Sequence, residues 1–336
     1  MSQPPPSMSP EEPTSIDDAQ LPQIKLAGLI KGDLETRRAL LAACEKNGFF
    51  YLDIVGGDDQ FLQTWDKLLE VMAGYFHQPH EVKMLDDRQS DTHGYEPMAT
   101  SAGAAPGLPD YYESLKVSRD ELWQNSPKMA SIVKTQREIF EAYIASANAV
   151  VSTVLRELSV ALGDQYPLAE AHPDDRPSRS TLSVFRYPKQ DEGVELSGLG
   201  HNKHTDLGTL TLLLCRQWGL QVLTEDNGWQ FVAPRPGCAV VNVGDSLRFL
   251  SGLRLRSVVH RVVPRNDAHR QDEDRYSVAY FLRPADDVTY CDVNGRTVSA
   301  WAWHNDKFDM FRQPHDIQES NAVATGGMER ADTLIF

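Results

Sequence analysis

Two histidines and one aspartate in this chain have the types and the spacing of ligands for a single metal ion. His204 and Asp206 lie two residues apart at the start of the apolar stretch DLGTLTLLL. Side chains two apart in a strand share a face, and such polar groups are costly to bury without a partner. His260, between valines in SVVHRVVP, is predicted to be the third ligand from another strand.

Two histidines and one carboxylate form the facial triad of non-haem Fe(II) oxygenases, which leaves the opposite face of the ion open for a cosubstrate and O2. A lone strand histidine is more often an ordinary core residue, so the prediction depends on the conjunction of all three residues. His201 forms an HxxH with His204. Because residues three apart in a strand point to opposite faces, we expect His201 to lie in a loop outside the ligand set.

A second group of side chains is suited to binding a carboxylate. Arg275 and Ser277 are two apart in RYSVAYFL, the predicted strand that follows His260. A guanidinium binds a carboxylate through two parallel hydrogen bonds, and the hydroxyl can donate one more. Tyr187, in the first predicted strand of the second half, could add a phenolic hydrogen bond.

The elements that must position these residues differ between the two halves of the chain. Apolar residues at helical spacing predict helices over 33–47, 58–76 and 127–162, with Asp33 as an N-cap and a long loop over 86–117. After about residue 178, short apolar segments alternate with Gly, Pro, Asn and Asp, which is typical of a sandwich or jelly roll.

These patterns predict an α+β protein whose jelly-roll core is flanked by helices. We expect four parts: a disordered tail over 1–20, a mostly helical N-terminal region over 21–165, the jelly-roll core over 178–286, and a C-terminal segment over 287–336 that packs on the core.

Composition narrows the kind of partner. The 336 residues include 48 acidic and 33 basic side chains, for a net charge of −15, which argues against binding to nucleic acid or to an anionic membrane. No segment approaches the length of a membrane span, and the N-terminus does not resemble a signal peptide. The four cysteines lie far apart and predict free thiols. We therefore expect a cytoplasmic monomer that binds a small molecule.

At these residues the chain resembles the Fe(II)/2-oxoglutarate-dependent dioxygenases of the isopenicillin N synthase-like family. The resemblance is carried by HTD at 204–206, His260, RYS at 275–277 and RYP at 186–188. Upstream, LPQIKL, ACEKNGFFYL, FHQPHEVKM and HGY occur in the family's order, so the resemblance spans residues 21–315. Lys25 stands where the family has Asp, and the segment between His260 and Arg275 is longer and more polar than in many relatives.

The resemblance implies a double-stranded β-helix with Fe(II) bound by His204, Asp206 and His260 at one mouth. It implies that 2-oxoglutarate chelates the iron while Arg275 and Ser277, aided by Tyr187, hold its distal carboxylate. O2 then takes the last open position, 2-oxoglutarate is converted to succinate and CO2, and no catalytic side chain is needed beyond the metal ligands.

The substrate that the resemblance implies is a small organic metabolite, which is hydroxylated, desaturated or rearranged in a ring, within secondary metabolism. We expect an apolar, aromatic pocket over the iron, walled by the 86–117 segment, with contributions from Tyr95 and Phe281.

Three alternatives stay open on the sequence. An isopenicillin N synthase-type oxidase keeps the triad and uses its arginine and serine for a different anion, and a 2-oxoglutarate requirement for succinate formation would separate the two. A non-catalytic binder of the same fold would bind a ligand without turnover. A zinc hydrolase would need a general base near an activated water, for which the sequence offers no candidate.

Overall fold

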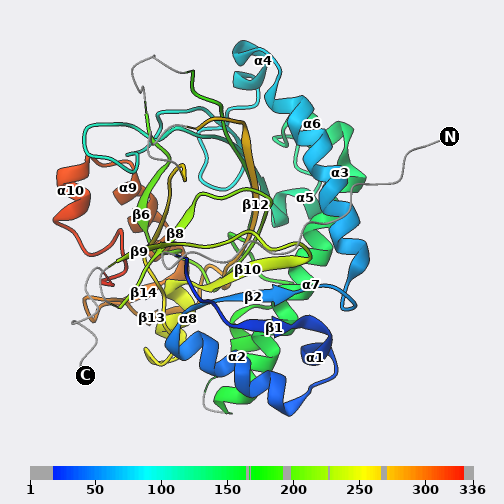
Figure 1. Cartoon of the computed structure of the whole chain (residues 1–336), viewed down its shortest axis with the longest axis vertical. Helices are drawn as coiled ribbons and strands as arrows, with labels where there is room; N and C mark the ends of the chain where they lie inside the picture. Colours follow the sequence, from blue (N-terminus) through cyan, green and yellow to red (C-terminus); the bar gives the residue numbers. More distant parts are fainter. Residues whose placement is uncertain are drawn as a thin grey trace.

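The computed structural model describes residues 18–163, 166, 168–191, 198–225, 228–265 and 271–328. Two β-sheets form its centre (Figure 1). The larger sheet runs in the order β1 (Gln23–Lys25), β2 (Phe49–Asp53), β10 (Cys238–Val243), β7 (Leu210–Cys215), β12 (Arg275–Leu282), β5 (Thr181–Tyr187), β4 (Glu113–Ser118) and β3 (Gly94–Glu96). The smaller sheet has the order β6 (His201–His204), β11 (His260–Val262), β8 (Leu220–Leu223) and β9 (Trp229–Phe231).

Alternation along the strands gives the larger sheet two different faces. In β12, Val278, Tyr280 and Leu282 belong to the main apolar core. Side chains of the intervening residues point the opposite way, because successive residues of a strand alternate between faces. Arg275 and Ser277 therefore lie on the face that is turned from the helices, inside the jelly roll. The predicted α+β class and the jelly-roll core are confirmed.

Helices cover the outer face of the larger sheet. The long helix α7 (Arg137–Leu162) contacts β7 and β12, and α3 (Asp59–Phe76) and α2 (Leu34–Lys46) pack against it. In Figure 1, α3 and α7 lie on the right, away from α9 (Ala300–Phe311) and α10 (His315–Glu319) on the left, and α2 lies at the bottom. The remaining helices are α1 (Leu26–Ile30), α4 (His80–Met84), α5 (Arg119–Trp123), α6 (Ser131–Thr135), η1 (Leu168–Ala171) and α8 (Asp245–Leu250), and β13 (Thr289–Cys291) pairs with β14 (Thr297–Ser299).

The predicted helix starts are confirmed by their caps. The Asp33 carboxylate accepts a hydrogen bond from the Thr36 backbone N–H at 2.7 Å, and Asp58 accepts one from the Phe61 backbone N–H at 3.0 Å. Each carboxylate satisfies a backbone donor that has no partner in the first helical turn. At the other end of α2, Gly48 takes a φ of +65°, and a Cβ there would lie 2.2 Å from the Arg256 carbonyl oxygen.

Local patterns were less informative in two segments. The helix predicted over 127–162 is divided into α6 and α7, because Gln136 leaves the helical region with φ −117° and ψ 29°. The predicted loop over 86–117 contains β3 and most of β4, which extend the larger sheet beyond β5. Pairing with β5 brings together segments some 70 residues apart, and no local turn signal reports such a contact.

The prediction of a disordered tail over residues 1–20 is wrong for the last residues of that range. Residues 1–17 lie outside the described residues, but Asp18 forms a β-bridge with Phe231, and the Ala19 backbone N–H donates to the Phe231 carbonyl at 2.8 Å. Ala19 is buried in the apolar cluster that contains Phe49. Of the long polar segment between His260 and Arg275, residues 266–270 also lie outside the described residues. Within the described ranges, no helix is both long and apolar enough to cross a membrane.

Candidate active site

The three predicted metal ligands meet inside the jelly roll. His204 ends β6, and His260 begins β11 directly opposite it in register. Asp206 follows in the turn between β6 and β7, not in one continuous strand as the spacing suggested. One ligand atom from each residue lies within 4.8 Å of the others, and the Asp206 Oδ1 is 3.7 Å from the Nε2 of both histidines.

Hydrogen bonds to the chain orient the imidazole rings. The Nδ1 of His204 lies 2.8 Å from the Asn202 carbonyl oxygen, and the Nδ1 of His260 lies 3.0 Å from that of Val258. A carbonyl only accepts, so Nδ1 carries the proton and Nε2 keeps its lone pair for a metal.

The carboxylate of Asp206 is oriented in the same way. Its Oδ2 accepts hydrogen bonds from the Thr211 hydroxyl at 2.6 Å and from the Asn242 amide at 2.7 Å, which directs Oδ1 toward the histidines. Both partners are polar residues within apolar strands, LTLLLC and CAVVNV. Sequence reasoning missed them, although a hydroxyl and an amide among leucines and valines are a usable signal of a buried polar contact.

The electrostatics favour a neutral imidazole at His204 and an ionised carboxylate at Asp206. Burial holds the pKa of His204 well below its usual value, and the neighbouring His260 and His201 lower it further. For Asp206, burial acts to raise the pKa, but His260 and the bonds from Asn242 and Thr211 outweigh it, so this pKa is lowered. Two imidazole nitrogens and one carboxylate oxygen fit Fe(II).

His201 lies closer to the triad than its spacing predicted. It begins β6, and its ring stacks on that of His204 with centroids 4.4 Å apart and planes 22° from parallel. The expectation that it lies in a loop on the opposite face is wrong. The pairing of β6 with β11 shifts register, since His204 faces His260 but His201 faces Val262. This β-bulge puts one extra residue into β6 and returns His201 to the face of His204.

The predicted carboxylate-binding residues form a second cluster in the interior. Arg275 is 1% exposed, its Nε donates to the Trp218 carbonyl at 2.8 Å, and its guanidinium lies 4.8 Å from the centre of the Tyr187 ring. Its Nη1 is buried and has no hydrogen-bond partner among the described residues. Ser277 is also buried and follows two residues later on the same face. A buried donor without a partner is costly, and a bound carboxylate would satisfy it.

Gly219 is a further residue that sequence reasoning missed. It has a φ of +144°, and a Cβ at this position would lie 2.8 Å from the Arg275 Nε. Any side chain at 219 would therefore displace the guanidinium. The only sequence signal is a glycine directly before a strand, which also fits an ordinary turn.

The pocket beside the triad is more polar than expected. Phe281 lines it, as predicted, together with Phe185, Phe308 and Phe311. Its wall also carries charged residues, namely Asp91, Glu96, Lys116, Arg283 and Arg312.

Tyr95 lies outside this pocket. It is 4% exposed, its hydroxyl donates to Glu113 at 2.6 Å, and it belongs to the main apolar core. The tyrosine that lines the pocket is Tyr112, from the same predicted loop.

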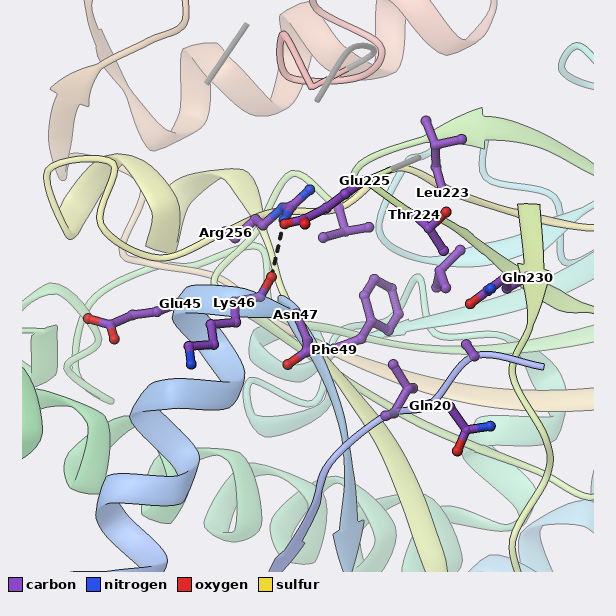
Figure 2. Close-up of a pocket in the computed structure, with 14 residues that line it drawn as sticks. Gln20, Glu45, Lys46, Asn47, Phe49, Leu223, Thr224, Glu225, Gln230 and Arg256 are labelled. Carbon is purple, nitrogen blue, oxygen red and sulfur yellow. Dashed lines mark hydrogen bonds and ion pairs between the residues drawn. The ribbon is translucent and has the colours of Figure 1, made fainter. Parts of the chain in front are cut away.

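A broader hollow opens elsewhere, between the end of α2 and the β8–β9 pair (Figure 2). Glu45, Glu225 and Arg256 lie at its rim. Arg256 forms an ion pair with Glu225 and donates a hydrogen bond to the Lys46 carbonyl at 3.1 Å. Phe49 lies deeper and meets the ring of His260 edge-on at 5.3 Å. None of its lining residues belongs to the triad, so we assign the chemistry to the smaller pocket.

A buried lysine connects helix α9 to the triad segment. Lys307 is fully buried and forms an ion pair with Asp245, and its Nζ donates to the Thr205 hydroxyl at 2.6 Å. Asp245 also accepts a hydrogen bond from Ser257 at 3.0 Å. Thr205 stands between His204 and Asp206, so this network fixes the segment that carries two of the three candidate ligands.

Comparison with known proteins assigns the chain to a family. Residues 179–284 match the model of the 2OG-Fe(II) oxygenase superfamily, and residues 21–136 match that of the N-terminal region of non-haem dioxygenases in morphine synthesis. The 2-oxoglutarate-dependent dioxygenase frbH of Dothideomycetidae sp. is 52% identical over 326 residues, covering 96% of this chain and 99% of frbH. The chain belongs to the 2OG-Fe(II) oxygenase superfamily. The resemblance seen in the sequence is confirmed.

A second relative and a solved structure support the same family assignment and fold. The oxidoreductase vrtI of Penicillium aethiopicum is 51% identical over 336 residues, covering 97% of this chain and 80% of vrtI. Among solved structures, a full-length Neurospora crassa protein in complex with alpha-KG has a TM-score of 0.69 at 22% identity, covering 85% of this chain and 95% of the Neurospora chain. That likeness shows the shared fold. The dioxygenase uses Fe(II) and 2-oxoglutarate, as expected for its family.

Proposed function

We propose that this dioxygenase oxidises a small organic metabolite of secondary metabolism, with His204, Asp206 and His260 as its iron ligands. Support comes above all from the convergence of these three buried side chains within 4.8 Å. When bound, Fe(II) and 2-oxoglutarate supply O2 activation coupled to the loss of CO2 from 2-oxoglutarate. The substrate outcome in this proposal is hydroxylation, desaturation or ring rearrangement.

The side chains of this dioxygenase have distinct roles in the proposal. The Nδ1 hydrogen bonds keep both histidines in the tautomer that offers Nε2, and Thr211 and Asn242 hold Asp206 in its orientation. Arg275 and Ser277 bind the distal carboxylate of 2-oxoglutarate, with Tyr187 beside them. The phenylalanines of the pocket exclude water from the reacting centre.

Small-molecule substrates are also found among the structural neighbours. The Neurospora crassa protein has also been solved with alpha-KG and thymine, and JOX2 has been solved with 2OG, Fe and JA.

For this chain we propose a cytoplasmic monomer. All four cysteines are free thiols, in keeping with a reducing compartment. Light scattering of the purified protein would measure the oligomeric state.

The iron site is tested without knowledge of the substrate. Anaerobic protein loaded with Fe(II) and 2-oxoglutarate is expected to show a weak visible charge-transfer band, because a chelating keto acid on ferrous iron absorbs there. The band requires the triad, an open face of the ion and chelation by 2-oxoglutarate together. Its absence in protein shown to hold iron would favour the isopenicillin N synthase-type alternative.

The cosubstrate site is tested by Arg275→Met. Losing a desolvated, charge-assisted contact should weaken 2-oxoglutarate binding by about tenfold or more, measured by titrating the charge-transfer band. Ser277→Ala and Tyr187→Phe should weaken binding less, because each removes a neutral contact. Arg216→Gln is the control, since Arg216 is exposed and paired with Asp66. An unchanged dissociation constant in Arg275→Met would contradict the assignment.

A further inference from the structure

One cationic side chain of the pocket beside the triad forms no ion pair among the described residues. Three cationic side chains line this pocket: Lys116, Arg283 and Arg312. Lys116 pairs with Glu96 at 2.8 Å, and Arg312 pairs with Asp91. Both of these carboxylates belong to the same pocket wall. Arg283 has no carboxylate within ion-pair distance among the residues that the structure describes. The third carboxylate of the wall, Asp206, acts on Arg283 from farther away, and its Oδ1 is directed toward His204 and His260.

Arg283 is nevertheless buried. It is 6% exposed, and its Nη1 donates to the Arg179 carbonyl and, at 2.9 Å, to the Thr181 hydroxyl. Its Nε is buried and has no hydrogen-bond partner within the described ranges. Burial lowers the pKa of this guanidinium to about 10. The charge of Asp206 offsets part of this burial, but a buried cation with no ion pair stays unfavourable unless a ligand supplies the opposite charge.

The position of Arg283 separates it from the 2-oxoglutarate site. Arg275 is the first residue of β12, and Arg283 follows its last residue, so their Cα atoms are about 26 Å apart at the usual rise of a strand. A five-carbon diacid that binds Arg275 cannot also reach an arginine at the other end of the strand. Arg283 instead lies beside Phe281, whose ring centre is 5.3 Å from its guanidinium.

We propose that the substrate of this enzyme is a carboxylic acid whose carboxylate binds Arg283. Its apolar part then contacts Phe281, Phe308 and Phe311, and the ring of Phe311 lies edge-on to His204 at 5.6 Å, beside the triad. The inference rests on the proposed function, because it takes this pocket as the substrate site. It narrows the substrate class from organic metabolites in general to those with an anionic end.

Matched acids and amides test the proposal. The full chain is loaded with Mn(II) and saturated with N-oxalylglycine, which occupies the 2-oxoglutarate site and leaves Arg275 unavailable. The probes are ω-phenyl carboxylic acids from phenylacetate to 5-phenylpentanoate and their primary amides, with affinity measured by calorimetry. The tightest acid is expected to bind about tenfold more strongly than its amide, because a charge-assisted contact replaces a neutral one.

Substitutions of Arg283 test whether this residue causes the preference for the acid over the amide. Arg283→Gln should bring the affinity of the acid down to that of the amide, and Arg283→Lys should restore part of the difference. Arg216→Gln should leave it unchanged. Equal binding of acid and amide by the unaltered protein, a preference that survives Arg283→Gln, or no binding by any acid of the series would each overturn the inference.

N-oxalylglycine distinguishes this failure from failure of the proposed function. Its affinity should be the same in the unaltered protein and in Arg283→Gln, because Arg283 lies outside the cosubstrate site. If the unaltered protein failed to bind N-oxalylglycine, the proposed function would be contradicted. If N-oxalylglycine bound normally while the acids bound no more tightly than their amides, the role of Arg283 alone would be contradicted.

Discussion

Asp206→Ala is expected to reduce 2-oxoglutarate turnover by about a thousandfold or more, which corresponds to about 4 kcal/mol in activation free energy. The substitution removes the single anionic ligand and leaves two neutral imidazoles to hold a divalent ion. His204→Ala and His260→Ala should have effects of similar size. Asp206→Glu should also lose most activity, since the longer side chain displaces its oxygen from the position that Thr211 and Asn242 fix. Succinate formation measures all four.

Two measurements separate loss of the metal from loss of the fold. The circular dichroism spectrum of each variant should match that of the unaltered protein, because the apolar core lies on the other face of the larger sheet. Iron content after dialysis should fall in parallel with activity. His77→Ala serves as the control, since the side chain of His77 is 62% exposed. A variant that keeps both bound iron and near-normal turnover would show that its residue is not a ligand.

Lys307→Met is expected to lower the free energy of unfolding by about 3–5 kcal/mol. The substitution leaves the Asp245 carboxylate buried without its paired lysine. Among the described residues, the hydroxyls of Thr205 and Ser257 are then its side-chain donors. Urea denaturation of the metal-free protein measures the change without a contribution from iron binding.

A double substitution of the Lys307–Asp245 pair gives the decisive comparison. Lys307→Met with Asp245→Asn should recover a large part of the loss, because no unpaired charge then stays buried. The exposed pair of Arg216 and Asp66 provides the control, and Arg216→Met should change stability by less than about 1 kcal/mol. If Lys307→Met behaved like Arg216→Met, the network would not stabilise the protein.

The chemistry of the site was largely predictable, because spacing and residue type report on local geometry. His204, Asp206 and His260 converge, and Arg275 has a buried nitrogen without a partner among the described residues. For Arg275 and Ser277, both in β12, alternation decides which face they share, and this period is visible in the sequence. Asp206 lies between β6 and β7, so its residue type predicted it rather than strand alternation.

Other features depend on contacts between distant segments. The place of His201 follows from a bulge in the pairing of β6 with β11, and the two strands are more than 50 residues apart in the chain. The partners of Asp206 come from two further strands. The role of Lys307 depends on how α9 packs, and a lysine in AWAWHNDKFDMF reads as an exposed residue of an amphipathic helix.

Helix α9 both attaches itself to the jelly roll and forms part of the pocket wall. Trp303 and Lys307, one turn apart, are fully buried and attach the helix to the barrel, whereas Phe308 and Phe311 line the pocket. The two duties meet at Phe311, which follows Lys307 by one turn. Its ring centre lies 5.9 Å from the Lys307 Nζ, and the ring is edge-on to that of His204. Phe308 packs against His304 and Phe311 instead, so a change at 308 alters the pocket wall before it affects a candidate iron ligand. A library randomised at 308, with Phe311 kept, would be a compact starting point for changing which substrates are oxidised.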